Sequence, residues 1–143
     1  AVEAAVTDWT PEAVCVRQAE QLGTGQALEQ AQQALAGATG PAIVLYGDTP
    51  FVRPGTLQAM QAAQADHAVV VLGFRPADPG RYGRLVTRGA LLDRIVEWKD
   101  ADPATRAIGL CNSGVICTDI GLLFSLLAEV TNDNAAGEHY LTD

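Results

Sequence analysis

The sequence PAIVLYGDTPFV, residues 41–52, decides the fold class. Its apolar run stops at Tyr46-Gly47-Asp48 and leads into a turn with proline, which predicts a buried strand that carries one carboxylate to a sheet edge. In open α/β sheets, ligands bind outside the carboxyl ends of the strands. Asp48 follows a glycine that allows close approach, so it suits a metal ion that bridges phosphates. An ordinary turn can have the same sequence, so the rest of the chain is needed to distinguish a metal ligand from a turn residue.

The composition limits the class of protein. The chain has 143 residues, enough for one domain with a sizeable core, and 48% of them are hydrophobic. No apolar run is long enough to span a bilayer, and no secretory signal pattern opens the chain at Ala1, so we expect no membrane partner. The net charge of −8 argues against nucleic acid as the main partner, because phosphate backbones are bound by Lys and Arg.

The cysteines, Cys15, Cys111 and Cys117, follow no metal-ligand spacing. If Cys111 and Cys117 share one extended strand, they lie roughly 20 Å apart, which is beyond the reach of a disulfide. We therefore expect buried, reduced thiols in a cytoplasmic protein. The two histidines, His67 and His139, are far apart in sequence, which argues against a histidine metal site or a Ser-His-Asp triad.

The first half of the chain alternates strands with helices. We expect strands over residues 13–17, 42–46 and 67–74, and helices in the second half of 18–37 and from Pro54 onward. Gly37 stands where the first of these helices should stop, and Leu57 and Met60 should face inward from the second. The order strand–helix–strand–helix–strand predicts a parallel sheet with crossover helices.

The second half predicts a more mixed arrangement. We expect strands over 83–87 and 91–99 around a hairpin-like break at Arg88-Gly89, and a long strand over 107–118. Residues 100–106 should form a helical turn or loop. Asp119 is expected to cap a leucine-rich helix, and the polar tail ends in what resembles a helix start. We interpret the whole as one α/β domain.

Four segments place polar groups next to glycine at predicted strand ends or loops. They are Gln18 to Gly25, Tyr46 to Asp48, Tyr82 to Arg84, and Glu97 with Asn112 to Gly114. Glycine removes the side chain and lets backbone N–H groups reach a ligand. Thr24 could cap the following helix and turn that helix N-terminus toward an anion or a base edge.

Each segment also has a plain structural explanation. The alternatives are a surface position for Gln18, a turn cap for Asp48, a bulge for Gly83, an ion pair of Glu97 with Lys99 or Arg94, and backbone satisfaction at a bulge for Asn112. Singly, each alternative is preferred to a functional role. Taken together, the structural explanations are no longer preferred to a functional one, because the predicted fold brings several of these segments to one crevice.

Six motifs occur in order between Val14 and Asp143: QAEQLGTG, VLYGDTP, DPGRYGRLV, IVEWKDA, CNSGV and NDNAAGEHYLTD. In this order they resemble the uridyltransferase domain of the bacterial bifunctional N-acetylglucosamine-1-phosphate uridyltransferase/glucosamine-1-phosphate acetyltransferase. The resemblance implies a Rossmann-like nucleotide-diphospho-sugar transferase fold with a mixed, mostly parallel sheet. It also implies a Mg²⁺-dependent reaction of UTP with N-acetylglucosamine 1-phosphate, which gives UDP-N-acetylglucosamine and pyrophosphate for cell-wall synthesis.

The resemblance further implies a role for individual residues. Gln18 would read the uracil edge, and Gly23 and Thr24 would line the uridine pocket. Tyr46 and Gly47 would flank the ribose and phosphate region. Asp48 would be the magnesium ligand and the catalytic carboxylate. The N-acetylglucosamine group would be held by Gly83, Glu97 and Asn112.

Several parts of the resembled family have no counterpart in residues 1–143. The glycine-rich phosphate loop with its Arg and Lys belongs before Ala1, and an asparagine that is the second magnesium ligand belongs after Asp143. The acetyltransferase domain, which supplies most contacts of the expected homotrimer, is also absent. We therefore expect a partial nucleotidyltransferase domain, incomplete at both ends and inactive alone.

Three other functions remain open at this point. One is a sugar-1-phosphate nucleotidyltransferase with a different base or sugar. Another is a non-catalytic sugar-nucleotide binding module, because the residues present mostly bind nucleoside and sugar. The third is a structural subdomain whose exposed sheet edge drives self-association.

Overall fold

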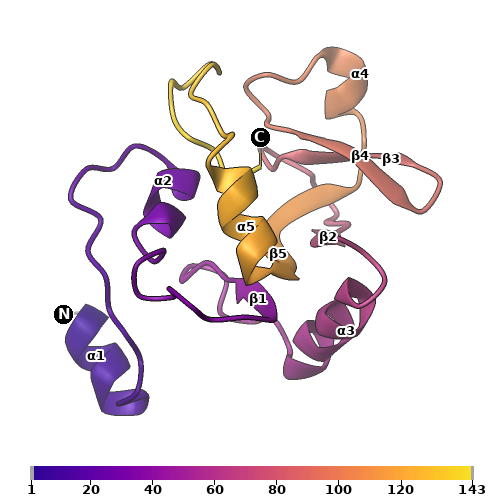
Figure 1. Ribbon diagram of the computed structural model, residues 1–143. Helices are drawn as coiled ribbons and strands as arrows, with labels where there is room; N and C mark the ends of the chain where they lie inside the picture. Colours follow the sequence, from indigo (N-terminus) through magenta and orange to yellow (C-terminus); the bar gives the residue numbers. More distant parts are fainter. Residues whose placement is uncertain (1, 143) are drawn as a thin grey trace.

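The computed structural model describes residues 2–142 (Figure 1). The helices are α1 (Val2–Trp9), α2 (Thr24–Glu29), α3 (Pro54–Gln64), α4 (Pro103–Arg106) and α5 (Ile120–Leu127). The strands are β1 (Pro41–Val44), β2 (Val69–Phe74), β3 (Arg84–Arg88), β4 (Leu91–Val96) and β5 (Cys111–Asp119). None of the helices described is both long and apolar enough to cross a membrane.

The sheet is built around β5, and this corrects the expected parallel pairing. Cys117 of β5 lies opposite Ile43 of β1 on one edge and opposite Val70 of β2 on the other, and both pairs are antiparallel. β1 and β2 do run in the same direction, but β5 lies between them. β3 meets β5 at Arg84↔Cys111 and forms an antiparallel hairpin with β4. All strand pairs within residues 2–142 are therefore antiparallel, and the mostly parallel sheet was wrong.

The core lies between α3 and one face of the sheet. Met60, Val115 and Cys117 are buried there, and Leu57 and Val70 pack against them. This confirms the predicted start of α3 at Pro54 and its inward-facing side chains. Helix α5 covers the opposite face. Its Leu123 and Leu127 side chains line a cavity together with the alternate β2 residues.

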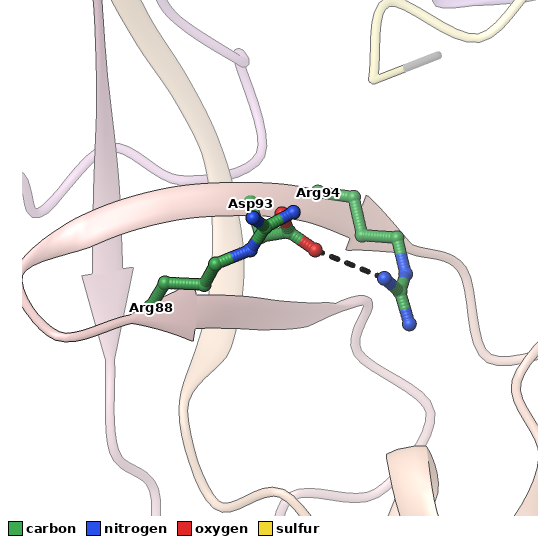
Figure 2. A network of polar contacts seen from close by, with 3 residues as sticks. All are labelled: Arg88, Asp93 and Arg94. Carbon is green, nitrogen blue, oxygen red and sulfur yellow. Dashed lines mark hydrogen bonds and ion pairs between the residues drawn. The ribbon is translucent and has the colours of Figure 1, made fainter.

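The β3–β4 hairpin turns where the sequence predicted it, at Gly89, whose φ of +63° is in the left-handed region that favours glycine. Its register shifts between Val86 and Thr87. Asp93 of β4 forms an ion pair with Arg88 across the hairpin and another with its neighbour on the same strand, Arg94 (Figure 2). Both arginines are exposed, so this network contributes little to stability.

The amino-terminal segment departs from the prediction. Residues 13–17 form no strand, because no described strand lies beside them to satisfy their backbone, and Val14 is 73% exposed. Cys15 is exposed too, which corrects its expected burial, whereas Cys111 and Cys117 are buried on β5 as expected. Helix α1 was not predicted and buries no side chain; it lies to one side of the molecule (Figure 1).

Helix ends also differ from the expectation. α2 ends at Glu29, and residues 30–37 continue as turns before Gly37, which has a φ of +81°. At α5 the prediction holds, because Asp119 accepts hydrogen bonds from the N–H groups of Gly121 (2.8 Å) and Leu122 (3.3 Å). The tail through Thr142 forms no helix start, and Asp143 lies outside the described residues.

Candidate functional site

One pocket of about 310 Å³ gathers residues from segments that are far apart in the sequence. Its lining includes most of the predicted site residues: Thr24, Tyr46, Asp48, Gly83, Glu97 and Asn112. They come from the start of α2, the loop after β1, the loop before β3, the end of β4 and the start of β5. The strand after which Asp48 was predicted thus delivers it to a shared crevice.

The carboxylate of Glu97 lies directly against the backbone of Gly83. A Cβ atom at Gly83 would stand 3.1 Å from Oε1 and 3.2 Å from Oε2 of Glu97. The backbone N–H of Asn112 donates to the Gly83 carbonyl oxygen at 2.9 Å, and the Thr142 hydroxyl donates to Glu97 Oε1 at 3.1 Å. Glu97 lines the pocket and makes no ion pair within the described part of the chain, so its second oxygen has no cationic partner there.

Asn112 is 7% exposed and serves the backbone as well as the pocket. Its Oδ1 accepts a hydrogen bond from the Gly114 N–H at 3.0 Å, which stabilises the bulge in β5. The plain structural explanation of this residue is therefore confirmed, and its functional role stays a prediction. The contact fixes the amide so that its side-chain nitrogen is the group left to bond a ligand.

Tyr46 covers Gly114, and this contact explains the glycine. Gly114 has a φ of +82°, and a Cβ atom there would stand 2.5 Å from Cε2 of the Tyr46 ring. Burial raises the pKa of Tyr46 above its usual value, the charges of Glu97 and Asp48 add to this, and a hydrogen bond with Thr24 acts against it. The phenol therefore stays protonated at neutral pH and can donate a hydrogen bond.

The tail closes the pocket over the start of α2. The Leu141 N–H donates to Thr24 Oγ1 at 3.0 Å, and the Gly25 N–H donates to the His139 carbonyl at 2.8 Å. Gly23, with a φ of +120°, is the N-cap, and a Cβ there would stand 2.4 Å from the His139 oxygen. Thr24 is therefore the first helical residue and not the cap that we expected; its hydroxyl binds the tail instead.

Three predicted residues lie beside the pocket, outside its lining. The Gln18 side chain donates to the carbonyl of Gly23 at 3.2 Å and to Oε1 of Gln26 at 2.7 Å. Gln18 and Gly23 therefore form one unit next to Thr24. Gly47 lies between two lining residues and does not itself line the pocket.

The pocket also contains residues that the sequence did not assign. Tyr82, Ser113 and Gly114 belong to segments that were singled out for their glycines, but no role was given to them. Arg81, Tyr140 and Thr142 were missed altogether. The motifs DPGRYGRLV and NDNAAGEHYLTD contained them, so the motifs themselves were the available signal.

The side chains of the pocket could hold a magnesium ion only together with substrate phosphates and water. Asp48 is exposed and forms no hydrogen bond or ion pair with another described residue. The structure, over residues 2–142, contains no group of three or more Asp, Glu, His or Cys side chains that could hold a metal. A free carboxylate of this kind fits Mg²⁺ bound jointly by one or two carboxylates, substrate phosphates and water, and does not fit an all-protein cage.

Comparisons with known proteins agree with the motifs. No protein-family model matches the chain. The bifunctional protein GlmU of Jannaschia sp. is 63% identical over 142 residues, which cover 99% of this chain and 31% of that protein. The bifunctional protein GlmU of Cereibacter sphaeroides is 69% identical over 128 residues, which cover 90% of this chain and 28% of that protein. The chain thus spans about a third of the length of these relatives.

A solved structure supports the fold. UDP-glucose pyrophosphorylase complexed with UDP-glucose matches with a TM-score of 0.71 and 22% identity, over 99% of this chain and 58% of that chain. At this identity the likeness concerns the fold alone, and it confirms the expected nucleotide-diphospho-sugar transferase fold. Along nearly its whole length, this chain is thus similar to about a third of the bifunctional GlmU proteins.

Proposed function

We propose that this chain is part of a nucleotidyltransferase domain that transfers a uridylyl group from UTP to N-acetylglucosamine 1-phosphate, with Mg²⁺, giving UDP-N-acetylglucosamine and pyrophosphate. The observation that carries the proposal is the single pocket that contains both the free carboxylate of Asp48 and the Gly83–Glu97–Asn112 unit. The identity to GlmU proteins supports the same reaction.

The chemistry asks for positioning and charge neutralisation more than for a nucleophilic side chain. The sugar phosphate oxygen would attack the α-phosphorus of UTP, and pyrophosphate would leave. Asp48 would hold the magnesium ion, which when bound offsets negative charge on the phosphates. Tyr46, protonated and backed by Thr24, can donate a hydrogen bond to a ligand oxygen beside this position.

Sugar selectivity would come from the Gly83–Glu97–Asn112 unit. The free oxygen of Glu97 can accept hydrogen bonds from sugar hydroxyl groups, and the Asn112 amide can donate to an acetamido oxygen. Buried polar groups of this kind reject a ligand that leaves them unpaired more strongly than an apolar pocket rejects a misfit. Because Gly83 lacks a side chain, the sugar can approach Glu97 closely.

A ligand panel tests the proposal. Thermal unfolding of the chain would be followed with Mg²⁺ and UDP-N-acetylglucosamine, UDP-glucose, UTP or a CDP-sugar. A ligand at a hundred times its Kd stabilises the folded state by about 2.7 kcal/mol. We expect this stabilisation with UDP-N-acetylglucosamine. Glu97→Gln should raise the Kd for UDP-N-acetylglucosamine at least tenfold, because an amide accepts hydrogen bonds at one of its two terminal atoms and a carboxylate at both.

The matched control is Glu12→Gln, an exposed carboxylate outside the pocket, which should bind like the unchanged chain. An identical shift with Glu97→Gln, or no shift with any uridine ligand from a chain that unfolds cooperatively, would contradict the proposal. We also expect no pyrophosphate release from residues 1–143 alone.

A non-catalytic sugar-nucleotide binding module is the second candidate. It is favoured by the scarcity of cations: within the described residues, the pocket lining has a single basic side chain. Pyrophosphate release by a longer GlmU-like protein that contains this chain separates the two functions. If this protein releases pyrophosphate and Asp48→Asn abolishes the release, the chain belongs to an enzyme. If the protein binds the sugar nucleotide but releases no pyrophosphate, the chain is a binding module.

A further inference from the structure

Arg81 is a cation in the pocket that the proposed function has not used. It lies in the loop between β2 and β3 and lines the pocket together with Asp48 and Glu97. Among residues 2–142 it contributes the only basic side chain to this lining. Its guanidinium makes no hydrogen bond or ion pair with any residue that the structure describes.

The backbone around Arg81 is held firmly while its side chain is free. Asp78 Oδ1 accepts from the Gly80 N–H at 2.9 Å, and the Tyr82 ring meets Phe74 edge-on with 4.8 Å between the ring centroids. The buried Arg84 guanidinium donates to the carbonyl oxygens of Gly80 (3.1 Å) and Tyr82, on either side of Arg81. The loop thus uses one arginine to fix its own backbone and leaves the other available.

We propose that Arg81 binds the phosphate groups of the sugar nucleotide in this pocket, an inference that rests on the proposed function. Asp48 and Glu97 set two negative charges against the one positive charge of Arg81, so without Mg²⁺ the lining repels a diphosphate, and Arg81 is the side chain of the lining that can attract it. A planar guanidinium can donate two parallel hydrogen bonds to a phosphate. Because the loop backbone is already ordered, binding has to immobilise only the side chain.

Charge-changing variants test the role of Arg81. Arg81→Gln should weaken binding of UDP-N-acetylglucosamine about tenfold in calorimetric titration, because a charge-assisted hydrogen bond from an exposed side chain is lost. Binding of uridine, which has no phosphate, should change less than twofold. Arg81→Lys keeps the charge without the fork, so it should recover part of the affinity for UDP-N-acetylglucosamine.

Arg75→Gln is the matched control. Arg75 is an exposed arginine of the same loop, it lies outside the pocket lining, and its variant should bind UDP-N-acetylglucosamine like the unchanged chain. The affinity of the unchanged chain should also fall with added salt more steeply than that of Arg81→Gln. Equal Kd values for Arg81→Gln and the unchanged chain, or an equal loss for uridine, would overturn the inference.

Failure of the proposed function would be recognised separately. In that case the unchanged chain binds neither uridine nor UDP-N-acetylglucosamine, and the decisive probe becomes inorganic pyrophosphate with Mg²⁺. Pyrophosphate binding that Arg81→Gln weakens and Arg75→Gln does not would still support a phosphate site at Arg81. Absence of pyrophosphate binding would overturn that site as well.

Discussion

Replacing Arg84 with methionine should destabilise the fold more than any other single arginine substitution in the chain. Arg84 is 1% exposed, and it pairs with no carboxylate among the described residues. Its guanidinium donates to the carbonyl oxygens of Gly80 (3.1 Å), Arg106 (3.2 Å), Pro79 (3.4 Å) and Tyr82. It also lies 5.1 Å from the centroid of the Trp98 ring.

The magnitude follows from these contacts. A hydrogen bond from a charged donor contributes about 1.5 kcal/mol or more net, so the three closer bonds together give roughly 4.5 kcal/mol. Methionine keeps part of the apolar contact with Trp98 and removes a buried charge, which returns about 1 kcal/mol. We therefore expect a loss of about 3–4 kcal/mol in the free energy of unfolding. For a chain of this size that lowers the Tm by roughly 10–15 °C.

Urea unfolding followed by circular dichroism measures the loss, and the slope of free energy against urea should stay unchanged. Arg88→Met is the matched control on the same strand. The side chain of Arg88 is 83% exposed and pairs only with Asp93 and not with the backbone, so its loss should cost less than about 1 kcal/mol (Figure 2). If Arg84→Met and Arg88→Met unfold at the same urea concentration, the backbone-anchoring role of Arg84 is refuted.

Two further predictions concern Tyr46 and its glycine. Gly114→Ala should lower the free energy of unfolding by about 2–4 kcal/mol, because it adds a clash with the Tyr46 ring to the strain of a positive φ. Gly37→Ala is the control: it has nearly the same φ but nothing within 4 Å of its Cβ, so it should cost only about 1 kcal/mol. Equal losses for the two variants in urea unfolding would contradict the Tyr46 contact. The raised pKa of Tyr46 means that the folded state holds its proton above the usual value of 10.0, so stability should fall as pH rises past 10.0. Above pH 10.0, the urea midpoint of Tyr46→Phe should therefore fall less than that of the unchanged chain. An equal fall in both chains would contradict the raised pKa of Tyr46.

Elements with a local signal could be predicted from the sequence. Pro54 and the inward spacing of Leu57 and Met60 predicted α3, and Asp119 predicted the start of α5, because caps and apolar spacing act within a few residues. The direction of strand pairing could not be predicted in this way. Helix α3 joins β1 to β2, as in a parallel sheet, but the strand that lies between them, β5, follows β2 only after about forty further residues.

In the candidate site, too, residues with a local sequence signal could be predicted, and residues brought in by distant parts of the chain could not. Residues on strand ends, such as Asp48 and Asn112, were found because strand ends and glycines are visible in the sequence. Thr142 and Tyr140 were missed because they reach the pocket only through the return of the tail over α2. The extended run at residues 13–17 was overpredicted for a related reason, since β propensity requires a partner strand that propensity alone does not reveal.

The bond between the Leu141 N–H and Thr24 Oγ1 joins residues 117 positions apart, and this has a consequence during synthesis on the ribosome. At ordinary elongation rates, Thr24 is made about 6–23 s before its partner. The core of α3, β1, β2 and β5 needs nothing beyond Asp119, so it can assemble earlier, whereas the side of the pocket that the tail closes can form only after residues 139–142 have emerged. A released chain that ends near residue 130 is thus expected to fold at its core but to lack the contact of the tail with Thr24.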